Sequence, residues 1–312
     1  MAGDLARALL TAESPIVLEV IRDYRLPGWV NNEAFLLASS YSGDTEETLA
    51  VFDEALLRGV PTWVVTSGGE LARRAHAAGC PVFDLPPGRP PRAALGHSLP
   101  PVLLAAALMS GLDPAPVADS LEAACPRLDQ WGACWDGDEA AHGRGRLWRR
   151  SGAGPANLAR DIAGRIAGGI PVLYAGVGLY EPAAVRWRAQ LAENAKMLAS
   201  HHVLPEMDHN EIVGWQENRD LLARCHAVFL TGSHDHPRVA RRIAITAELI
   251  RPAAAGVETV RPPVGSRLEE LLALVLLGDH VSVHAATVHG VDPIPVQRIA
   301  HLKAALREGG PA

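Results

Sequence analysis

Short apolar runs alternate with helical patterns in the first third of the chain. Four runs predict β-strands, at residues 16–20, 34–39, 62–66 and 82–85. Between the second and third runs, apolar residues repeat at helical spacing over 45–58, and Gly59 and Pro61 end this helix. A second helix is predicted over 70–78. Strands that alternate with helices of this length predict a parallel sheet with right-handed crossovers.

The same alternation returns in the second half of the chain. Strands are predicted at 171–175, 227–231 and 256–260. Helices are predicted at 182–198, 237–250 and 268–277, and a last helix carries Ile299, Leu302 and Lys303. The pattern loosens between these halves, which predicts a partly helical linker. We therefore expect an α/β protein with an N-terminal domain over 1–113, a linker over 114–155 and a C-terminal domain over 156–312.

Composition narrows the class of protein. The chain has 312 residues, a formal net charge of −6 and 48% hydrophobic residues. This mild acidity argues against a nucleic acid or an anionic membrane as the main partner, because such partners need a concentrated basic patch. We find no run of about 18 uncharged apolar residues and no order typical of a signal peptide at the start. A cytoplasmic location is the expectation.

Cysteine and lysine usage add two observations. The four cysteines, at 80, 125, 134 and 225, have no CxxC spacing, which fits free thiols in a reducing compartment. Only two of the 29 basic residues are lysines, Lys196 and Lys303. A lysine retained in so arginine-rich a chain indicates either a chemical need for a compact ammonium or chance survival.

The clearest candidate site is the segment that leaves the strand at 34–39 and opens the next helix. It contains Ser40, Ser42, Gly43 and Thr45. The N–H groups of a helix start and the positive end of its dipole attract an anion, and hydroxyl groups can complete the site. One hydroxyl would suffice to cap the helix, so three hydroxyls favour a phosphate site over simple capping.

Two further segments belong to the first domain. Residues 66–69, Thr-Ser-Gly-Gly, follow the next strand, and they are either an ordinary turn or a second wall of the same cleft. Arg92 stands in a loop framed by Pro90 and Pro91. A guanidinium held there is either solvated or able to stabilise an oxyanion.

The second domain offers ionisable candidates. Glu193 and Lys196 lie off the apolar stripe of one helix, as an exposed ion pair or as part of a site. His209 lies in a polar segment, 205–215, that ends in an apolar run, and it could move protons near neutral pH. His201, His202, His234 and His236 are near it in sequence, but HEXXH is absent, and His234-Asp235-His236 suits a helix start equally well. No metal site is predicted.

The motifs together resemble the bifunctional phosphoglucose/phosphomannose isomerases, which consist of two sugar isomerase (SIS) domains. The resemblance covers nearly the whole chain in order. It rests on Ser-Tyr-Ser-Gly-Asp-Thr-Glu-Glu-Thr-Leu at 40–49, Thr-Ser-Gly-Gly at 66–69, Pro-Arg-Ala-Ala-Leu-Gly at 91–96, Glu-Asn-Ala-Lys at 193–196, Pro-Glu with His-Asn-Glu-Ile and Gly-Trp at 205–215, and Asp-Pro-Ile-Pro-Val with Leu-Lys at 292–303.

The resemblance implies a fold, a reaction and roles for residues. It implies two three-layer, flavodoxin-like α/β/α domains that interconvert glucose 6-phosphate or mannose 6-phosphate with fructose 6-phosphate, without a metal or other cofactor. Ser40, Ser42 and Thr45 would bind the phosphate. Glu193 would carry the proton between C1 and C2, Arg92 would stabilise the cis-enediolate, and His209 and Lys303 would assist ring opening. In that family the histidine comes from the partner subunit, which implies a homodimer.

Two differences from the family accompany the resemblance. The family's first strand and Gly-Gly-Ser loop are missing ahead of Gly3-Asp4-Leu5, so we expect an incomplete first domain, and Asp44 stands where Asn is usual. Either the start of the sequence is misplaced or the chain is a degenerate relative, and a non-catalytic sugar-phosphate-binding or regulatory SIS protein is therefore the alternative function. The preference between glucose and mannose phosphates stays open at this point.

Overall fold

The computed structural model describes residues 1–136 and 157–308. The chain divides into two compact units, Met1–Cys125 and Pro126–Ala312, which are described separately. Helix α5 (Ala115–Trp135) runs across the boundary between the units. It accounts for the first half of the predicted linker; residues 137–156 lie outside the described part, so the predicted domain limits stay a prediction.

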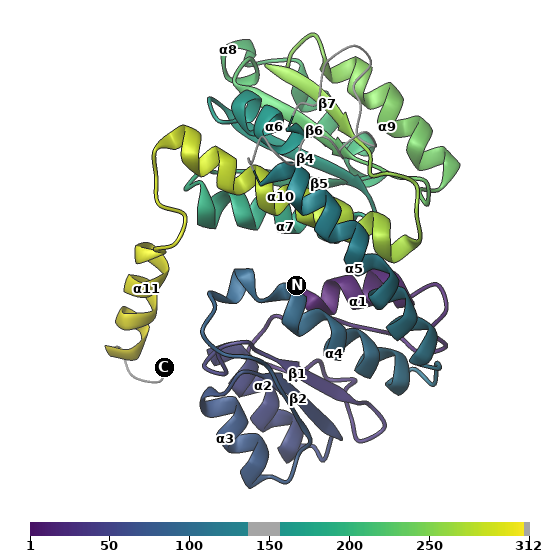
Figure 1. Cartoon of the computed structure of the whole chain (residues 1–312), viewed down its shortest axis with the longest axis vertical. Helices are drawn as coiled ribbons and strands as arrows, with labels where there is room; N and C mark the ends of the chain where they lie inside the picture. Colours follow the sequence, from purple (N-terminus) through teal and green to yellow (C-terminus); the bar gives the residue numbers. More distant parts are fainter. Residues whose placement is uncertain (137–156, 309–312) are drawn as a thin grey trace. The chain divides into compact units, whose positions relative to one another are not determined.

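The first unit is a parallel sheet with helices packed on it. The strands lie in the order β1-β2-β3, and Leu36 pairs with Thr62 and Val64 with Val82. Helices α2 and α3 pack against the sheet and each other, and α4, with α1 beside it, packs against β1 and β2 (Figure 1). The elements are α1 (Ala2–Leu10), β1 (Leu36–Ser39), α2 (Glu46–Leu57), β2 (Thr62–Thr66), α3 (Gly69–Ala77), β3 (Val82–Asp84), the 3₁₀ turn η1 (Pro91–Ala93) and α4 (Leu95–Met109).

The predicted strand over 16–20 is wrong. This segment pairs with no strand, and Val17 is 86% exposed, so its apolar residues belong to no sheet. Side chains hold the irregular segment instead: Arg22 pairs with Asp4 of α1, and the Arg58 guanidinium donates to the carbonyls of Pro27 and Val30 at 2.9 and 3.1 Å. Helix α4 was not predicted because it contains Pro100 and Pro101, which usually interrupt helices.

The second unit is a four-stranded parallel sheet in the order β5-β4-β6-β7. Helix α9 packs on one face, and α6, α7 and α10 form the layer on the other (Figure 1). The elements are α6 (Leu158–Ile166), β4 (Ile170–Gly176), α7 (Glu181–Asn194), β5 (Ser200–Leu204), the 3₁₀ turns η3 (Glu206–His209) and η4 (Glu211–Trp215), α8 (Arg219–Leu222), β6 (Cys225–Leu230), α9 (Pro237–Ile250), β7 (Gly256–Val260), α10 (Arg267–His289) and α11 (Gln297–Glu308).

Helix α10 is much longer than the predicted 268–277. It is the one described helix long and apolar enough to cross a membrane, but 61% of its most apolar window is buried inside the protein. It packs closely against α7, where a Cβ added to Gly278 would lie 2.1 Å from the Trp187 ring, whose Nε1 donates to the Leu274 carbonyl at 2.7 Å. The apolar character of α10 is therefore that of a core helix.

Helix α7 ends earlier than predicted, and a strand follows that the pattern did not show. The helix ends at Asn194, and Lys196 has a positive φ of 57°, which no helix continues through. Strand β5 contains His201 and His202, so its sequence lacks the apolar alternation that identifies strands.

Candidate active site

The phosphate-binding candidates lie together at the carboxyl edge of the first sheet, between β1 and α2. The Ser40 and Thr45 hydroxyls are 2.8 Å apart, and Ser42 Oγ accepts from the Asp44 N–H at 3.3 Å. Thr45 stands at the helix start, yet its side chain makes no capping hydrogen bond. The first N–H groups of α2 thus face this loop without a side-chain cap, which is the arrangement an anion needs.

Two glycines join this loop to the turn after β2. Gly43 has φ 73°, and a Cβ there would lie 1.9 Å from the Gly68 carbonyl oxygen. A Cβ on Gly69, at φ 71°, would lie 2.3 Å from the Ser42 carbonyl oxygen. The two loops therefore touch backbone to backbone, and only glycine fits at both positions. The Thr-Ser-Gly-Gly segment is thus built into the wall of the candidate phosphate site.

Tyr41 and Asp44 fix the surroundings of the loop. The Tyr41 hydroxyl donates to the Pro86 carbonyl at 2.7 Å and accepts from the Arg89 N–H at 3.2 Å, which draws the segment before Arg92 toward the loop. Arg92 itself is half-buried in η1. Asp44, the residue unusual for the family, accepts from the Glu70 N–H at 3.0 Å. Its charge is therefore directed at the positive end of α3.

The catalytic candidates of the second unit lie on three different elements. Glu193 is half-buried in the last turn of α7. His209 is the exposed last residue of η3, and Lys303 is exposed on α11. The three candidates thus come from separate segments of the second unit.

The segment that carries His209 is anchored on both sides, by residues that sequence reasoning did not single out. Asp208 accepts from Arg242 and Thr246 of α9, at 2.8 and 2.9 Å. Glu211 accepts from the Tyr174 hydroxyl at 2.6 Å. These contacts hold the backbone on both sides of His209, whose side chain is exposed.

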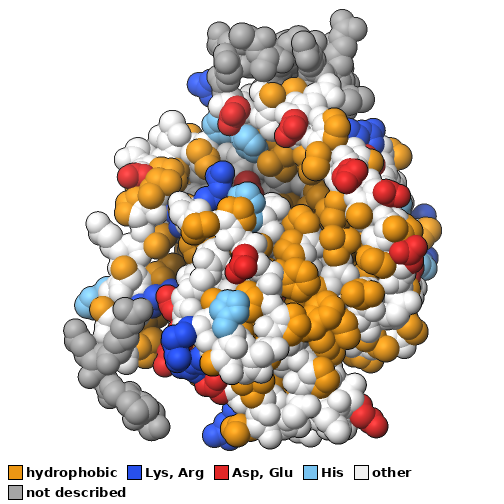
Figure 2. Space-filling view, turned by 60° about the horizontal axis from the view of Figure 1, so that its bottom comes forward, with side chains coloured by type: hydrophobic (Ala, Val, Ile, Leu, Met, Phe, Trp, Pro, Cys, Tyr) orange, Lys and Arg blue, Asp and Glu red, His pale blue; other side chains and the backbone are white. Residues whose placement is uncertain are grey.

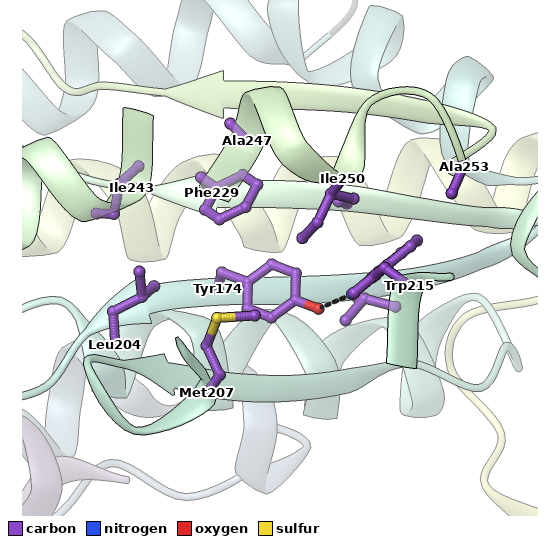
Figure 3. Close-up of a cluster of buried hydrophobic side chains, with 11 residues drawn as sticks. Tyr174, Leu204, Met207, Trp215, Phe229, Ile243, Ala247, Ile250 and Ala253 are labelled. Atoms are coloured by element: carbon purple, nitrogen blue, oxygen red, sulfur yellow. Dashed lines mark hydrogen bonds between the residues drawn. The ribbon is translucent and has the colours of Figure 1, made fainter. Parts of the chain in front are cut away.

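Tyr174, which donates to Glu211, lies in the hydrophobic core of the second unit. Trp215 donates from its Nε1 to the Tyr174 hydroxyl at 2.9 Å, and Tyr174 stacks on Phe229 with ring centroids 4.8 Å apart (Figure 3). Burial, with the hydrogen bond to Glu211, raises the pKa of Tyr174 far above its ordinary value, so the hydroxyl stays protonated. The density of ionisable residues before an apolar run was the sequence signal for this docked segment.

Strand β5 separates Glu193 from His209. Helix α7 runs back from the carboxyl edge of the sheet and ends at its amino edge, whereas η3 begins where β5 ends, at the carboxyl edge. Five residues of β5 span about 16 Å at ordinary strand rise. Within one copy of this unit, the carboxylate and the imidazole therefore lie at opposite edges of the sheet.

The second unit has its own counterpart of the candidate phosphate loop, at residues 231–236 between β6 and α9. Here the loop is filled by the fully buried carboxylate of Glu270 from α10. This carboxylate accepts from the Ser233 N–H at 2.9 Å, the Gly265 N–H at 3.2 Å, and the Ser233 and Tyr180 hydroxyls. Burial alone would raise the pKa of Glu270, but these hydrogen bonds hold it below its ordinary value.

The remaining sequence candidates have structural roles. Gly176, from the GxG pattern after β4, would place a Cβ 2.7 Å from Asp235, so glycine is needed for packing. His236 accepts from the Arg238 N–H at 3.1 Å and caps α9. Within residues 1–136 and 157–308 no group of three or more His, Cys, Asp or Glu side chains is placed to hold a metal ion.

Comparison with known proteins finds relatives over almost the whole chain. Residues 156–306 match the model of the bacterial phospho-glucose isomerase C-terminal SIS domain. A bifunctional phosphoglucose/phosphomannose isomerase of Caldicellulosiruptor bescii is 34% identical over 99% of this chain and 86% of that protein. The chain belongs to the bifunctional phosphoglucose/phosphomannose isomerase family. It is therefore an isomerase, as the resemblance of its motifs predicted.

Further comparisons agree with this family and fold. The phosphoglucose/phosphomannose isomerase of Aquifex aeolicus is 35% identical over 93% of this chain and 81% of that protein. The C-terminal domain of glucosamine-fructose-6-phosphate aminotransferase from Francisella tularensis superposes with a TM-score of 0.65 at 14% identity, covering 93% of this chain and 82% of that one. At that identity the likeness shows the SIS fold alone. The predicted α/β fold with parallel sheets of SIS type is confirmed.

The backbone contact at Gly43 yields a first prediction for this isomerase. Gly43→Ala and Gly79→Ala both place alanine at a positive φ, near 70°, but only Gly43 meets another backbone. We expect Gly43→Ala to weaken binding of inorganic phosphate by about tenfold or more, since it displaces the N–H and hydroxyl donors that would bind the charged phosphate. Gly79→Ala should lower only the melting temperature. Calorimetric titration of both variants measures this, and equal phosphate affinity in the two would contradict the assignment of the loop.

The filled loop of the second unit yields a pH prediction. Folding lowers the pKa of the Glu270 carboxyl, so this group stabilises the folded protein at any pH above 4.5, its ordinary pKa. The stabilisation is lost as the pH falls through the lowered pKa. Glu270→Gln should cost about 1–3 kcal/mol of unfolding free energy at pH 7. The cost should shrink below about pH 4. Urea unfolding across pH, with exposed Glu248→Gln as control, tests this; a cost independent of pH would refute it.

Proposed function

We propose that this isomerase interconverts glucose 6-phosphate and mannose 6-phosphate with fructose 6-phosphate, with Glu193 as the proton-transferring base. The observation that carries the proposal is the hydroxyl loop at Ser40, Ser42 and Thr45, which offers the phosphate a helix start without a side-chain cap, in a chain whose relatives are named for phosphoglucose and phosphomannose. The phosphate anchors the substrate and leaves C1 and C2 to be positioned for chemistry.

The proposed reaction redistributes hydrogen within one molecule. In the open-chain aldose, Glu193 removes the C2 proton, and the electron pair of that C–H bond forms the C1–C2 double bond of a cis-enediolate. Arg92 stabilises the negative charge that develops on the oxygens. Glu193 then returns the proton to C1 while the O2 proton passes to O1, which gives the ketose. Because no electrons leave the substrate, the proposed reaction needs no redox cofactor.

Ring opening precedes this transfer and needs an acid and a base near O1 and O5. We assign these roles to His209 and Lys303, as the resemblance implies. Both side chains are exposed in the described structure, and His209 is held at a fixed place by its neighbours Asp208 and Glu211. A single carboxylate that serves both C1 and C2 supports acceptance of both C2 epimers.

We further propose a homodimer in which His209 of one subunit serves the Glu193 site of the other. The separation of the two residues at opposite edges of one sheet supports this, because one copy does not place them together. Two apolar side chains on elements packed with the His209 segment are exposed, Val213 of η4 by 62% and Leu249 of α9 by 61%. Exposed hydrophobic side chains also occur on the face of the protein drawn in Figure 2. Apolar surface of this kind is typical of a subunit contact.

A cytoplasmic location completes the proposal. Cys80, Cys125, Cys134 and Cys225 are free thiols, which fits a reducing compartment. Burial raises the pKa of Cys80, Cys134 and Cys225, so these thiols are protonated and poorly reactive at neutral pH.

Glu193→Gln tests the base. Gln cannot accept the proton, so we expect the isomerisation rate to fall by about 10²- to 10⁴-fold with phosphate affinity unchanged. The measurement is a coupled assay with fructose 6-phosphate, together with exchange of deuterium from solvent into the substrate at C1 and C2. Glu248→Gln, an exposed carboxylate paired with Arg251, is the control. Full turnover by Glu193→Gln would refute the mechanism.

Mixing two inactive variants tests the shared site. Glu193→Gln and His209→Ala subunits, unfolded together and refolded as a mixture, would form mixed dimers with one intact Glu193–His209 pair. Random pairing should then restore about one quarter of the wild-type activity. If both residues act within one subunit, every site carries one lesion and the mixture stays as inactive as its components.

A further inference from the structure

Lys196 makes a set of contacts that the proposed mechanism does not use. Its ammonium donates to three backbone carbonyls, those of Glu193 at 2.5 Å, Pro295 at 2.8 Å and Pro293 at 3.3 Å. The first lies in the last turn of α7, and the other two lie in the turn between α10 and α11. One side chain thus joins the end of the helix that carries Glu193 to the segment that leads into Lys303.

A second contact holds the same region of the second unit. The ring nitrogens of His289, the last residue of α10, lie 2.9 Å from the Ala195 carbonyl oxygen and 2.7 Å from that of Ala167. The ends of α6, α7 and α10 therefore meet at the amino edge of the sheet. Lys196 extends this junction to the 291–296 turn, and α11 begins directly after that turn, at Gln297.

The backbone at Lys196 indicates that its side chain is needed there. Lys196 has φ 57°, and position 196 follows the end of a helix, where glycine is the usual residue. Among the described residues, only Lys196 and Asn218 adopt a positive φ without being glycine. Asparagine tolerates this conformation, whereas lysine does so with more strain. The three hydrogen bonds of the ammonium therefore give a reason for lysine at a position where glycine would be less strained.

We propose that Lys196 is a positioning residue that fixes the 291–296 turn on the end of α7 and so sets where Lys303 lies relative to Glu193. The inference rests on the proposed function, because it assumes that both residues act on the substrate. Lys196 itself touches only backbone carbonyls and not the reacting atoms. Its loss should therefore leave phosphate binding intact and slow the chemical step.

Lys196→Gly separates this role from a purely structural one. Glycine relieves the strained φ, which offsets part of the stability lost with the three hydrogen bonds, so the variant should stay folded with only a modest fall in melting temperature. We expect kcat to fall on the order of 10- to 100-fold, because a misplaced group slows the reaction without weakening ground-state binding, with KM changed by less than about threefold. Amide hydrogen exchange over 291–308 should become faster.

Asn218→Gly is the matched control, because it relieves a comparable positive φ (56°) in the same unit, at an exposed residue before α8. It should change neither kcat nor exchange over 291–308. The proposal is overturned if Lys196→Gly keeps wild-type kcat, whether or not its exchange changes, or if exchange over 291–308 stays slow. Full activity of Glu193→Gln would instead refute the proposed mechanism, and exchange in Lys196→Gly would then report on the turn alone.

Discussion

The direction of the strands in the second sheet is the constraint on which the candidate active site depends. In a parallel sheet every connecting helix returns to the edge where the next strand begins, so a residue at the end of a helix and a residue after a strand lie at opposite edges. Glu193 belongs to the first kind and His209 to the second. The length of β5 separates the two residues, so a small local movement of η3 or of the end of α7 does not bring them together. A reaction that uses both residues at once therefore favours two copies of the chain, and the anchored, exposed histidine fits such an arrangement.

The two carboxyl edges show how similar loops take different roles. In the first unit Gly43 and Gly69 let two loops meet through their backbones, and the start of α2 is left without a side-chain cap. In the second unit the corresponding loop receives the carboxylate of Glu270, which meets two N–H groups and two hydroxyls. The Glu270 carboxylate thus accepts the hydrogen bonds that these donors could otherwise give to a bound phosphate. Among the described residues, the loop of the second unit therefore has its donors satisfied from within the chain, unlike the candidate phosphate loop of the first unit.

Residue patterns predicted the elements with strong alternation and missed those in which another constraint dominates. The strand at 62–66 and the helix at 237–250 have the predicted limits, because their buried faces are continuous. Strand β5 was missed because its histidines interrupt the apolar alternation that identifies a strand. Helix α4 was missed because it contains two prolines. The hydroxyl loop could be predicted because its donors are consecutive in sequence. The contacts of Lys196 with Pro295 and of Glu270 with Ser233 could not, since these partners lie 99 and 37 residues away and only the fold brings them together.

The scarcity of lysine takes on a physical meaning at position 196. Arg186 shows the geometry that suits arginine. Its Nε and Nη2 donate to the two carboxylate oxygens of Asp279 at 2.8 and 2.7 Å. A planar guanidinium matches that geometry. The partners of Lys196 are three separate carbonyl oxygens from two segments, and an ammonium with three rotatable N–H donors matches them better than a planar fork does. Lysine at this position is therefore explained by the geometry of its acceptors, and the same geometry ties the end of α7 to the start of α11.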